Sequence, residues 1–364
     1  MLSNSFQVNY VLVAEPRNSR FTLSREKREE RAYYLGAAYG YFRGCLAGVS
    51  EKGYLGAVKC LVSQGANIHV NDEEALTSAS YYGHLEVVKF LIQSGADVHA
   101  NSDNALRWAS MCGHSEVTQF LIGVGADTHA KGGEALRFAS EKGHLKVVQF
   151  LVQSDTDVHT HNDEALRYAS INGHLEIVRF LILKGADVHV DDDEALKCAS
   201  SNGHLEVTQF LVSQGADVHA GGDEALRWAS KYGHLGVVKF LIGVGANVHA
   251  RNDDALGWAS EYGHLEVVQF LIGVGADVHA WNDNALIFAS KNGHLGIVKY
   301  LVSKGVDVHA DNDKALRWAS MRGHLEVAQY LIEKGAGEGE IRKDMSSYKI
   351  RKRQRKGAVK CLVK

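Results

Sequence analysis

The feature that most constrains this chain is a repeat of thirty residues. Gly-His occurs at residues 83–84 and then every thirty residues as far as 323–324, nine times in all. Ala-Leu recurs nine times with the same period, from residues 75–76 to 315–316. A fixed period of this length is typical of stacked supersecondary units, each of which buries its apolar face only against its neighbours. An array therefore replaces the roughly two or three globular domains that a chain of this length would otherwise suggest.

One unit of the array predicts two short helices. Leu106 and Ala109 supply the packing face of the first helix, and Gly113 ends it at a left-handed position that glycine adopts without strain. A second helix is expected from residues 115 to about 123, and Gly125 ends it. Helices shorter than about 12 to 15 residues are marginal in water, so each unit depends on its neighbours for stability.

The start of the first helix has its own local predictions. Asp103 precedes the apolar residues and is expected to act as an N-cap, accepting hydrogen bonds from the first amide groups of the helix. Arg107 follows four residues later, where it is expected to pair with Asp103 across one turn.

At this point the residues resemble a known family. Residues 83–100, GHLEVVKFLIQSGADVHA, resemble the second helix and exit turn of an ankyrin repeat, and Ala-Leu-Arg-Trp-Ala-Ser at 105–110 stands where that family has Thr-Pro-Leu-His-x-Ala. The resemblance covers about four-fifths of the chain. It implies an all-α, curved helix-turn-helix solenoid that binds other proteins.

The unit departs from that family by being thirty rather than thirty-three residues long. The three missing residues fall between Ala100 and Leu106, where the family builds a β-hairpin finger, so short turns are expected there instead. Shortened arrays with this repeat sequence resemble the ankyrin-repeat proteins of giant amoeba-infecting DNA viruses. That resemblance implies a host protein as the partner.

The chain divides into three parts. Residues 44–340 form the array of about ten repeats, of which the first is divergent. Residues 1–43 are an N-terminal segment whose helix is expected to cap the array, because a terminal unit needs one polar face. Residues 341–364 are a basic tail that contains a candidate nuclear-import cluster. The cluster consists of Lys349, Arg351, Lys352, Arg353, Arg355 and Lys356.

The tail also has a structural interpretation. Residues 357–363 repeat residues 56–62 letter for letter, so the tail is expected to be a degenerate capping repeat. Capping and import are compatible, and both hypotheses stay open.

Charge and motifs narrow the function. The net charge of −3 divides into +9 for residues 341–364, +3 for residues 1–43 and therefore −15 for the array, which opposes binding of nucleic acid. No GxGxxG after a strand, phosphate-binding loop, HExxH or GxSxG motif is present, so we expect no enzyme, no cofactor and no small-molecule substrate. Five cysteines without paired spacing indicate reduced thiols in an intracellular protein. We expect a monomer in the cytoplasm, with the nucleus as the alternative location. No apolar run is long enough to predict a membrane span.

The histidines do not predict a metal site, although 18 of the 19 lie in repeated motifs. Equivalent side chains on stacked helices are about 8 to 10 Å apart, whereas two nitrogen ligands of one zinc ion lie within about 4 Å of each other. We expect these imidazoles to bond to turn backbone instead.

Candidate binding residues come from the columns that vary among the repeats. These columns are the two residues before Gly-His and the turn before the first helix, and in ankyrin-like arrays they would line the concave groove. Tyrosine, tryptophan, methionine and arginine dominate interface energetics. The candidates are Tyr81, Tyr82, Met111, Tyr232, Arg251, Tyr262, Trp281, Met321 and Arg322. Simple variation of exposed residues is the open alternative for each of them.

Two further hypotheses concern aromatic residues. Tyr232, Tyr262 and Trp281 fall on neighbouring repeats and are expected to form one aromatic strip, with Arg251 beside it. The column that contains Trp228 and Trp258 is instead interpreted as packing between first helices.

The sequence thus favours a non-enzymatic scaffold that binds a protein partner along the concave face. One alternative is an adaptor that recruits host machinery through residues 1–43. The other is a nuclear, nucleic-acid-associated protein that uses the basic tail.

Overall fold

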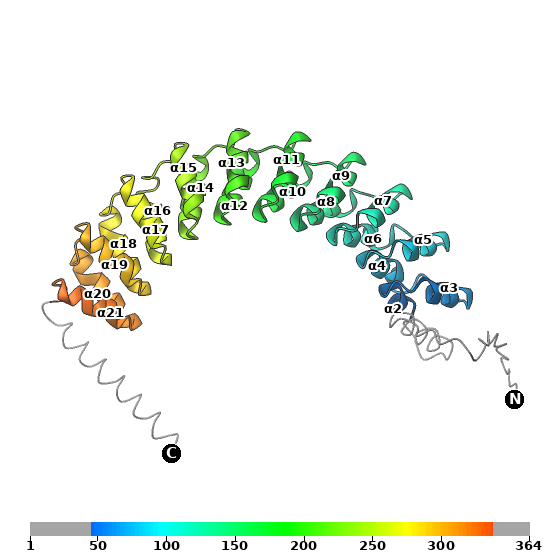
Figure 1. Cartoon of the computed structure of the whole chain (residues 1–364), viewed down its shortest axis with the longest axis horizontal. Coiled ribbons are helices and arrows are strands. Elements are labelled where there is room, and N and C mark those ends of the chain that lie inside the picture. Colours follow the sequence, from blue (N-terminus) through cyan, green and yellow to red (C-terminus); the bar gives the residue numbers. More distant parts are fainter. Residues whose placement is uncertain (1–44, 338–364) are drawn as a thin grey trace, which may run out of the picture. The chain divides into compact units, whose positions relative to one another are not determined.

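The computed structural model describes residues 45–337, in which twenty helices form ten helix-turn-helix pairs without a strand (Figure 1). The helices belong to two compact units, residues 45–97 and 98–337 of the described part. The predicted capping helix in residues 1–43 and the basic tail at 341–364 lie outside the described residues. The expected all-α repeat fold is confirmed for the part that the structure describes.

The first helix of each pair precedes the Gly-His motif. These helices are α2 Cys45–Glu51, α4 Glu74–Tyr81, α6 Ala100–Met111, α8 Ala130–Lys142, α10 Thr160–Ile171, α12 Val190–Ser201, α14 Ala220–Lys231, α16 Asp254–Tyr262, α18 Ala280–Asn292 and α20 Ala310–Arg322.

The second helix of each pair follows the Gly-His motif or its equivalent. These helices are α3 Leu55–Ser63, α5 Leu85–Gln93, α7 Ser115–Gly123, α9 Leu145–Gln153, α11 Leu175–Leu183, α13 Leu205–Ser213, α15 Leu235–Gly243, α17 Leu265–Gly273, α19 Leu295–Ser303 and α21 Leu325–Glu333.

The core of each pair is a short ladder of aliphatic side chains. In α6 and α7, Leu106, Ala109 and Leu121 are fully buried, and Val117 is almost so. Within each of the two units, the first helix packs on its own second helix and on the first helices of adjacent repeats, while second helices also pack on second helices. Each helix therefore gains from its neighbours the burial that it is too short to achieve alone.

Left-handed residues separate the helices, as the glycines predict. Gly113 has φ of +78° and Gly125 has φ of +101°. From α4 onward, the turn before each first helix holds three consecutive left-handed residues, such as Asn101, Ser102 and Asp103. Asparagine, aspartate and glycine tolerate this conformation best, which explains why they recur in the shortened turn.

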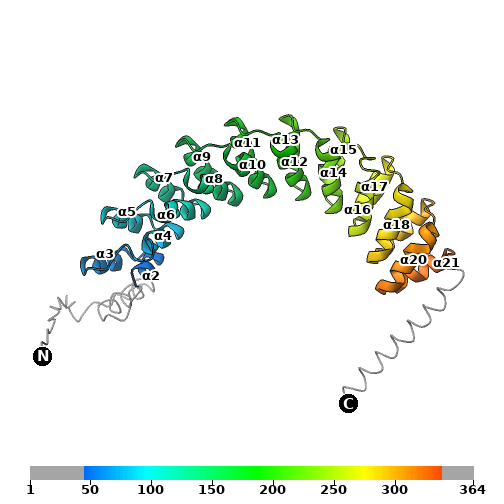
Figure 2. The same cartoon turned by 180° about the vertical axis from the view of Figure 1, so that it is seen from behind.

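From α8 to α15, the first helices lie on the inner side of the stack and the second helices on the outer side. The labels α8, α10, α12 and α14 stand inside α9, α11, α13 and α15 in both views (Figures 1 and 2). The inner side is where the variable residues before Gly-His occur. No helix in the described part of the chain is both long and apolar enough to cross a membrane.

Candidate functional site

From His144 to His294, the histidine of each Gly-His motif bonds to the repeat before it. The Nε2–H group of His144 donates to the carbonyl oxygen of Met111, 33 residues earlier, at 3.0 Å, and His204 makes the same bond to Ile171 at 2.8 Å. The imidazole also explains the glycine, because a Cβ at Gly113 would lie 2.5 Å from Nδ1 of His144. Burial lowers the pKa of His144, so the ring stays neutral. The expected bonds from these histidines to backbone are confirmed.

Asp103 holds the exit turn of its own repeat. Its Oδ1 accepts from the backbone N–H of Asp127 at 2.8 Å and lies 3.0 Å from Nδ1 of His99. Asp103 is 4% exposed, and the equivalent Asp253, which directly precedes α16, makes no side-chain capping bond. The prediction of an N-cap was wrong, because the left-handed turn points the side chain of Asp103 at a loop 24 residues further on. The turn histidine therefore bonds to a carboxylate rather than to backbone.

Arg107 also has a partner outside its own turn. Its Nε lies 2.8 Å from Oε2 of Glu134 on the next first helix, and its Nη1 donates to the carbonyl of Asn101 at 3.2 Å. The expected pairing with Asp103 was wrong for the same reason. Comparable pairs across one repeat join Arg137 to Glu164, Lys197 to Glu224 and Arg227 to Asp254.

The histidine and arginine contacts join successive repeats, and the aspartate contacts hold the turns within a repeat. Several of the residues predicted to bind a partner are well exposed: Tyr232 by 47%, Tyr262 by 49%, Trp281 by 60% and Met321 by 74%. Burying large apolar side chains of this kind stabilises a complex. Their exposure therefore leaves a surface able to bind.

Tyr232 and Tyr262 belong to a cluster centred on Lys231, at the carboxyl ends of α14 and α16. The Nζ atom of Lys231 lies 4.3 Å from the ring centroid of Trp228 and 5.3 to 5.4 Å from those of Tyr232, Trp258 and Tyr262. The two tryptophan centroids are 5.3 Å apart, and Trp228 stacks on Tyr232 at 5.8 Å. We call these five residues the Lys231 cluster.

Trp228 and Trp258 were not among the predicted binding residues. The structure leaves both half-buried, so they contact each other and also face the surface. The spacing of Trp228 and Tyr232, one helical turn apart, is the signal in the sequence that joins them. A comparison of equal positions in successive repeats does not pair Trp228 with Tyr232, because they occupy different positions of one repeat.

Arg251 and Trp281 lie at the opposite ends of the first helices. Arg251 donates from Nη2 to the carbonyl of Gly221 at 3.2 Å, and the indole of Trp281 donates to the carbonyl of Arg251 at 3.3 Å. These bonds place the two side chains on the row of left-handed turns. The proposed strip is therefore divided into two groups, and Trp258 links them because it also lines a cavity beside Trp281.

The remaining candidates lie elsewhere. Tyr81 and Tyr82 belong to residues 45–97, where their rings meet edge to face at 4.8 Å. Met111 is half-buried at the end of α6. Arg322 is exposed and lies over the ring of Trp318, 5.7 Å from its centroid.

Two hollows occur where a repeat carries a smaller residue than its siblings. One, of about 330 Å³, adjoins Cys198, which replaces an aromatic residue of the column. Burial raises the pKa of that thiol to about 12, so it is no nucleophile at neutral pH. The other, of about 270 Å³, adjoins Gly257, which stands where most repeats have arginine or lysine.

The fold and this surface define a helical repeat solenoid with an open inner face. A family model described as ankyrin repeats in three copies matches residues 46–132, 106–192, 168–252 and 256–342. These matches cover most of the chain, which therefore belongs to the ankyrin-repeat family. No curated protein matches it.

Proposed function

We propose that residues 98–337 form a non-enzymatic scaffold that binds a partner protein along the inner face of the first helices, with the Lys231 cluster as a principal anchor. The observation that carries this proposal is that two tyrosines of the cluster expose almost half their surface. Aromatic side chains that are rigid and partly exposed are typical anchors of protein interfaces.

The contrast between the two sides of the stack supports this assignment. The exposed apolar residues that follow second helices are aliphatic, such as Val124, Val244 and Val274. The inner side instead presents tyrosine, tryptophan and methionine, which are enriched at interfaces. The Gly-His and arginine contacts already join these repeats, and Tyr232 and Tyr262 keep almost half their surface exposed beside them.

Proteins of the ankyrin-repeat family generally bind other proteins, which is the broader statement that the family supports. The resemblance to arrays of giant amoeba-infecting viruses points to an intracellular host protein as the partner of a monomeric chain. The adaptor and nuclear hypotheses depend on residues 1–43 and 341–364, which lie outside the described residues.

The test is affinity capture from the native host cell, with bound proteins identified by mass spectrometry. We expect Tyr232→Ala combined with Tyr262→Ala to weaken capture of the specific partner by at least about tenfold. The melting temperature should stay close to that of the unchanged protein, since neither side chain is buried in the core.

The matched control is Val244→Ala combined with Val274→Ala, which removes two side chains of about 41% exposure from the outer side of repeats in the same region. Capture should be unaffected by this pair. If both pairs leave capture unchanged, the partner does not bind through the Lys231 cluster and the proposal fails.

A further inference from the structure

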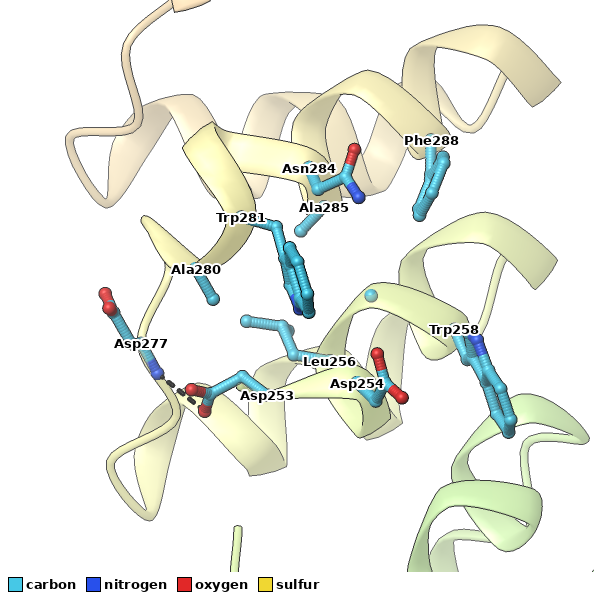
Figure 3. A pocket seen from close by; sticks show the side chains of 11 residues that line it. Asp253, Asp254, Leu256, Trp258, Asp277, Ala280, Trp281, Asn284, Ala285 and Phe288 are labelled. Carbon is cyan, nitrogen blue, oxygen red and sulfur yellow. Dashed lines mark hydrogen bonds between the residues drawn. The ribbon is translucent and has the colours of Figure 1, made fainter. Parts of the chain in front are cut away.

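A cavity of about 270 Å³ lies between α16 and α18 (Figure 3). Its walls include the rings of Trp258, Trp281 and Phe288, together with Asp254 and Asn284. Sites for whole drug-sized ligands measure about 300 to 1,000 Å³. This cavity is smaller, and its size suits a single side chain.

The cavity exists because residue 257 is glycine. The equivalent residues of other repeats include Arg137, Lys197 and Arg227, and a Cβ added at Gly257 would meet nothing within 4 Å. The surrounding sequence is otherwise that of its siblings: residues 255–260 read Ala-Leu-Gly-Trp-Ala-Ser, and residues 225–230 read Ala-Leu-Arg-Trp-Ala-Ser. The empty volume therefore corresponds to a missing basic side chain.

A sibling repeat shows what that volume holds when it is filled. The Cζ atom of Arg137 lies 4.2 Å from the ring centroid of Phe138 in its own repeat and 5.4 Å from that of Tyr168 in the next. Its guanidinium also lies 3.4 Å from Glu134 and 3.6 Å from Glu164. At the cavity, the residues equivalent to the two rings are Trp258 and Phe288, and both line it.

One of the two acidic partners also remains. Glu134 pairs with two arginines, Arg107 and Arg137, whereas the described residues give its equivalent, Asp254, one ion pair, with Arg227 at 3.3 Å. Arg107 donates a hydrogen bond to the carbonyl of Asn101. The equivalent carbonyl at the cavity belongs to Arg251, and it accepts a hydrogen bond from the indole of Trp281. The residue equivalent to Glu164 is Asn284, so the cavity keeps one of the two carboxylates and both aromatic faces of the Arg137 site.

We propose that this cavity binds an arginine side chain supplied by the partner protein. A planar guanidinium stacks between rings and reaches a carboxylate at the same time, which the compact ammonium of lysine does less well. The charge of −15 on the array favours a basic partner segment. The inference rests on the proposed function and names one chemical group of that partner.

The test uses N-acetylarginine N-methylamide, a probe that has the arginine side chain and no charged termini. The chain has five tryptophans, and their indole N–H signals are resolved by NMR and assigned with single Trp→Phe variants. We expect the probe to shift the signals of Trp258 and Trp281 while leaving Trp108 unchanged. The neutral citrulline analogue should bind at least about tenfold more weakly.

Two variants of one residue provide the matched control. Gly257→Arg restores the sibling sequence and should fill the cavity, which abolishes the shifts. Gly257→Ala adds a methyl group into open space and should keep them. Asp254→Asn should weaken binding by about tenfold, since it removes the carboxylate. Equal binding of arginine and citrulline, shifts that persist in Gly257→Arg, or no shift in the unchanged protein would each overturn the proposal.

Two further experiments distinguish free arginine from a partner side chain, and the cavity proposal from the scaffold proposal. Free arginine adds an α-ammonium and an α-carboxylate, which an arginine within a partner chain lacks, so tighter binding of free arginine than of the amide would indicate a free amino-acid site and refute a partner side chain. If Gly257→Arg leaves partner capture unchanged while the paired Tyr232 and Tyr262 substitutions abolish it, the cavity proposal fails and the scaffold proposal stands.

Discussion

Asp155 marks a local weakness in the array. The equivalent position after other second helices is glycine in the left-handed conformation, for example Gly185 with φ of +104° and Gly215 with φ of +102°. Asp155 adopts φ of +70° at this position. Its amide bonds to the carbonyl of Val152 at 3.3 Å, compared with 3.0 Å from Gly215 to Val212. A left-handed aspartate therefore stands where the other repeats have glycine.

We predict that Asp155→Gly stabilises this repeat. A left-handed conformation costs an L-residue about 1 to 2 kcal/mol, and the cost is lower for aspartate than for most residues. The new glycine also increases the conformational entropy of the unfolded chain, which reduces the gain in folding stability by about 0.4 to 1 kcal/mol. The net gain should be about 0.5 kcal/mol, and it is a backbone effect because a Cβ added at Gly215 would have no neighbour closer than 4.0 Å.

Amide hydrogen exchange measures this gain where it occurs, since a repeat array can open locally rather than in one global step. Exchange at residues 150–162 should be faster than at 210–222 in the unchanged protein. It should slow by about twofold in Asp155→Gly, which corresponds to about 0.5 kcal/mol. The melting temperature should rise slightly.

The reverse substitution supplies the control. Gly215→Asp should speed exchange at 210–222 by a similar factor, because it introduces the same strain into an otherwise regular turn. Unchanged or faster exchange in Asp155→Gly, or no effect of Gly215→Asp, would refute the strain argument.

Three other predictions address the core, the histidines and the buried thiol. Leu256→Ala should cost about 2 to 5 kcal/mol in urea unfolding, since the side chain is 1% exposed and leaves a cavity; a loss below about 1 kcal/mol would contradict its place in the core. Burial lowers the pKa of His144 and His234 in the folded protein. As the pH drops from about 7 towards 5, the unfolded chain therefore binds protons before the folded protein does, and folding stability should fall. His234→Gln should make the stability depend less on pH. Cys198, with its pKa of about 12, should be alkylated by iodoacetamide far more slowly than Cys60 at about pH 8, as mass spectrometry would show.

The sequence by itself determined the local structure of each repeat. The predicted second helix at 115–123 is α7, Ser115–Gly123, and Gly113 and Gly125 are left-handed as expected. Leu106 and Leu121 are fully buried. These predictions succeed because helix periodicity and the tolerance of glycine for positive φ act over a few residues.

Only the tertiary structure decided which residues meet between repeats. Asp103 bonds to a turn 24 residues later, Arg107 pairs with Glu134 27 residues later, and His144 bonds to a carbonyl 33 residues earlier. These offsets depend on how successive units are rotated and displaced, which a comparison of equal positions in the repeats does not contain. For the same reason, the sequence showed Gly257 as a variant position, and only the stacking of α16 against α18 turned it into a cavity.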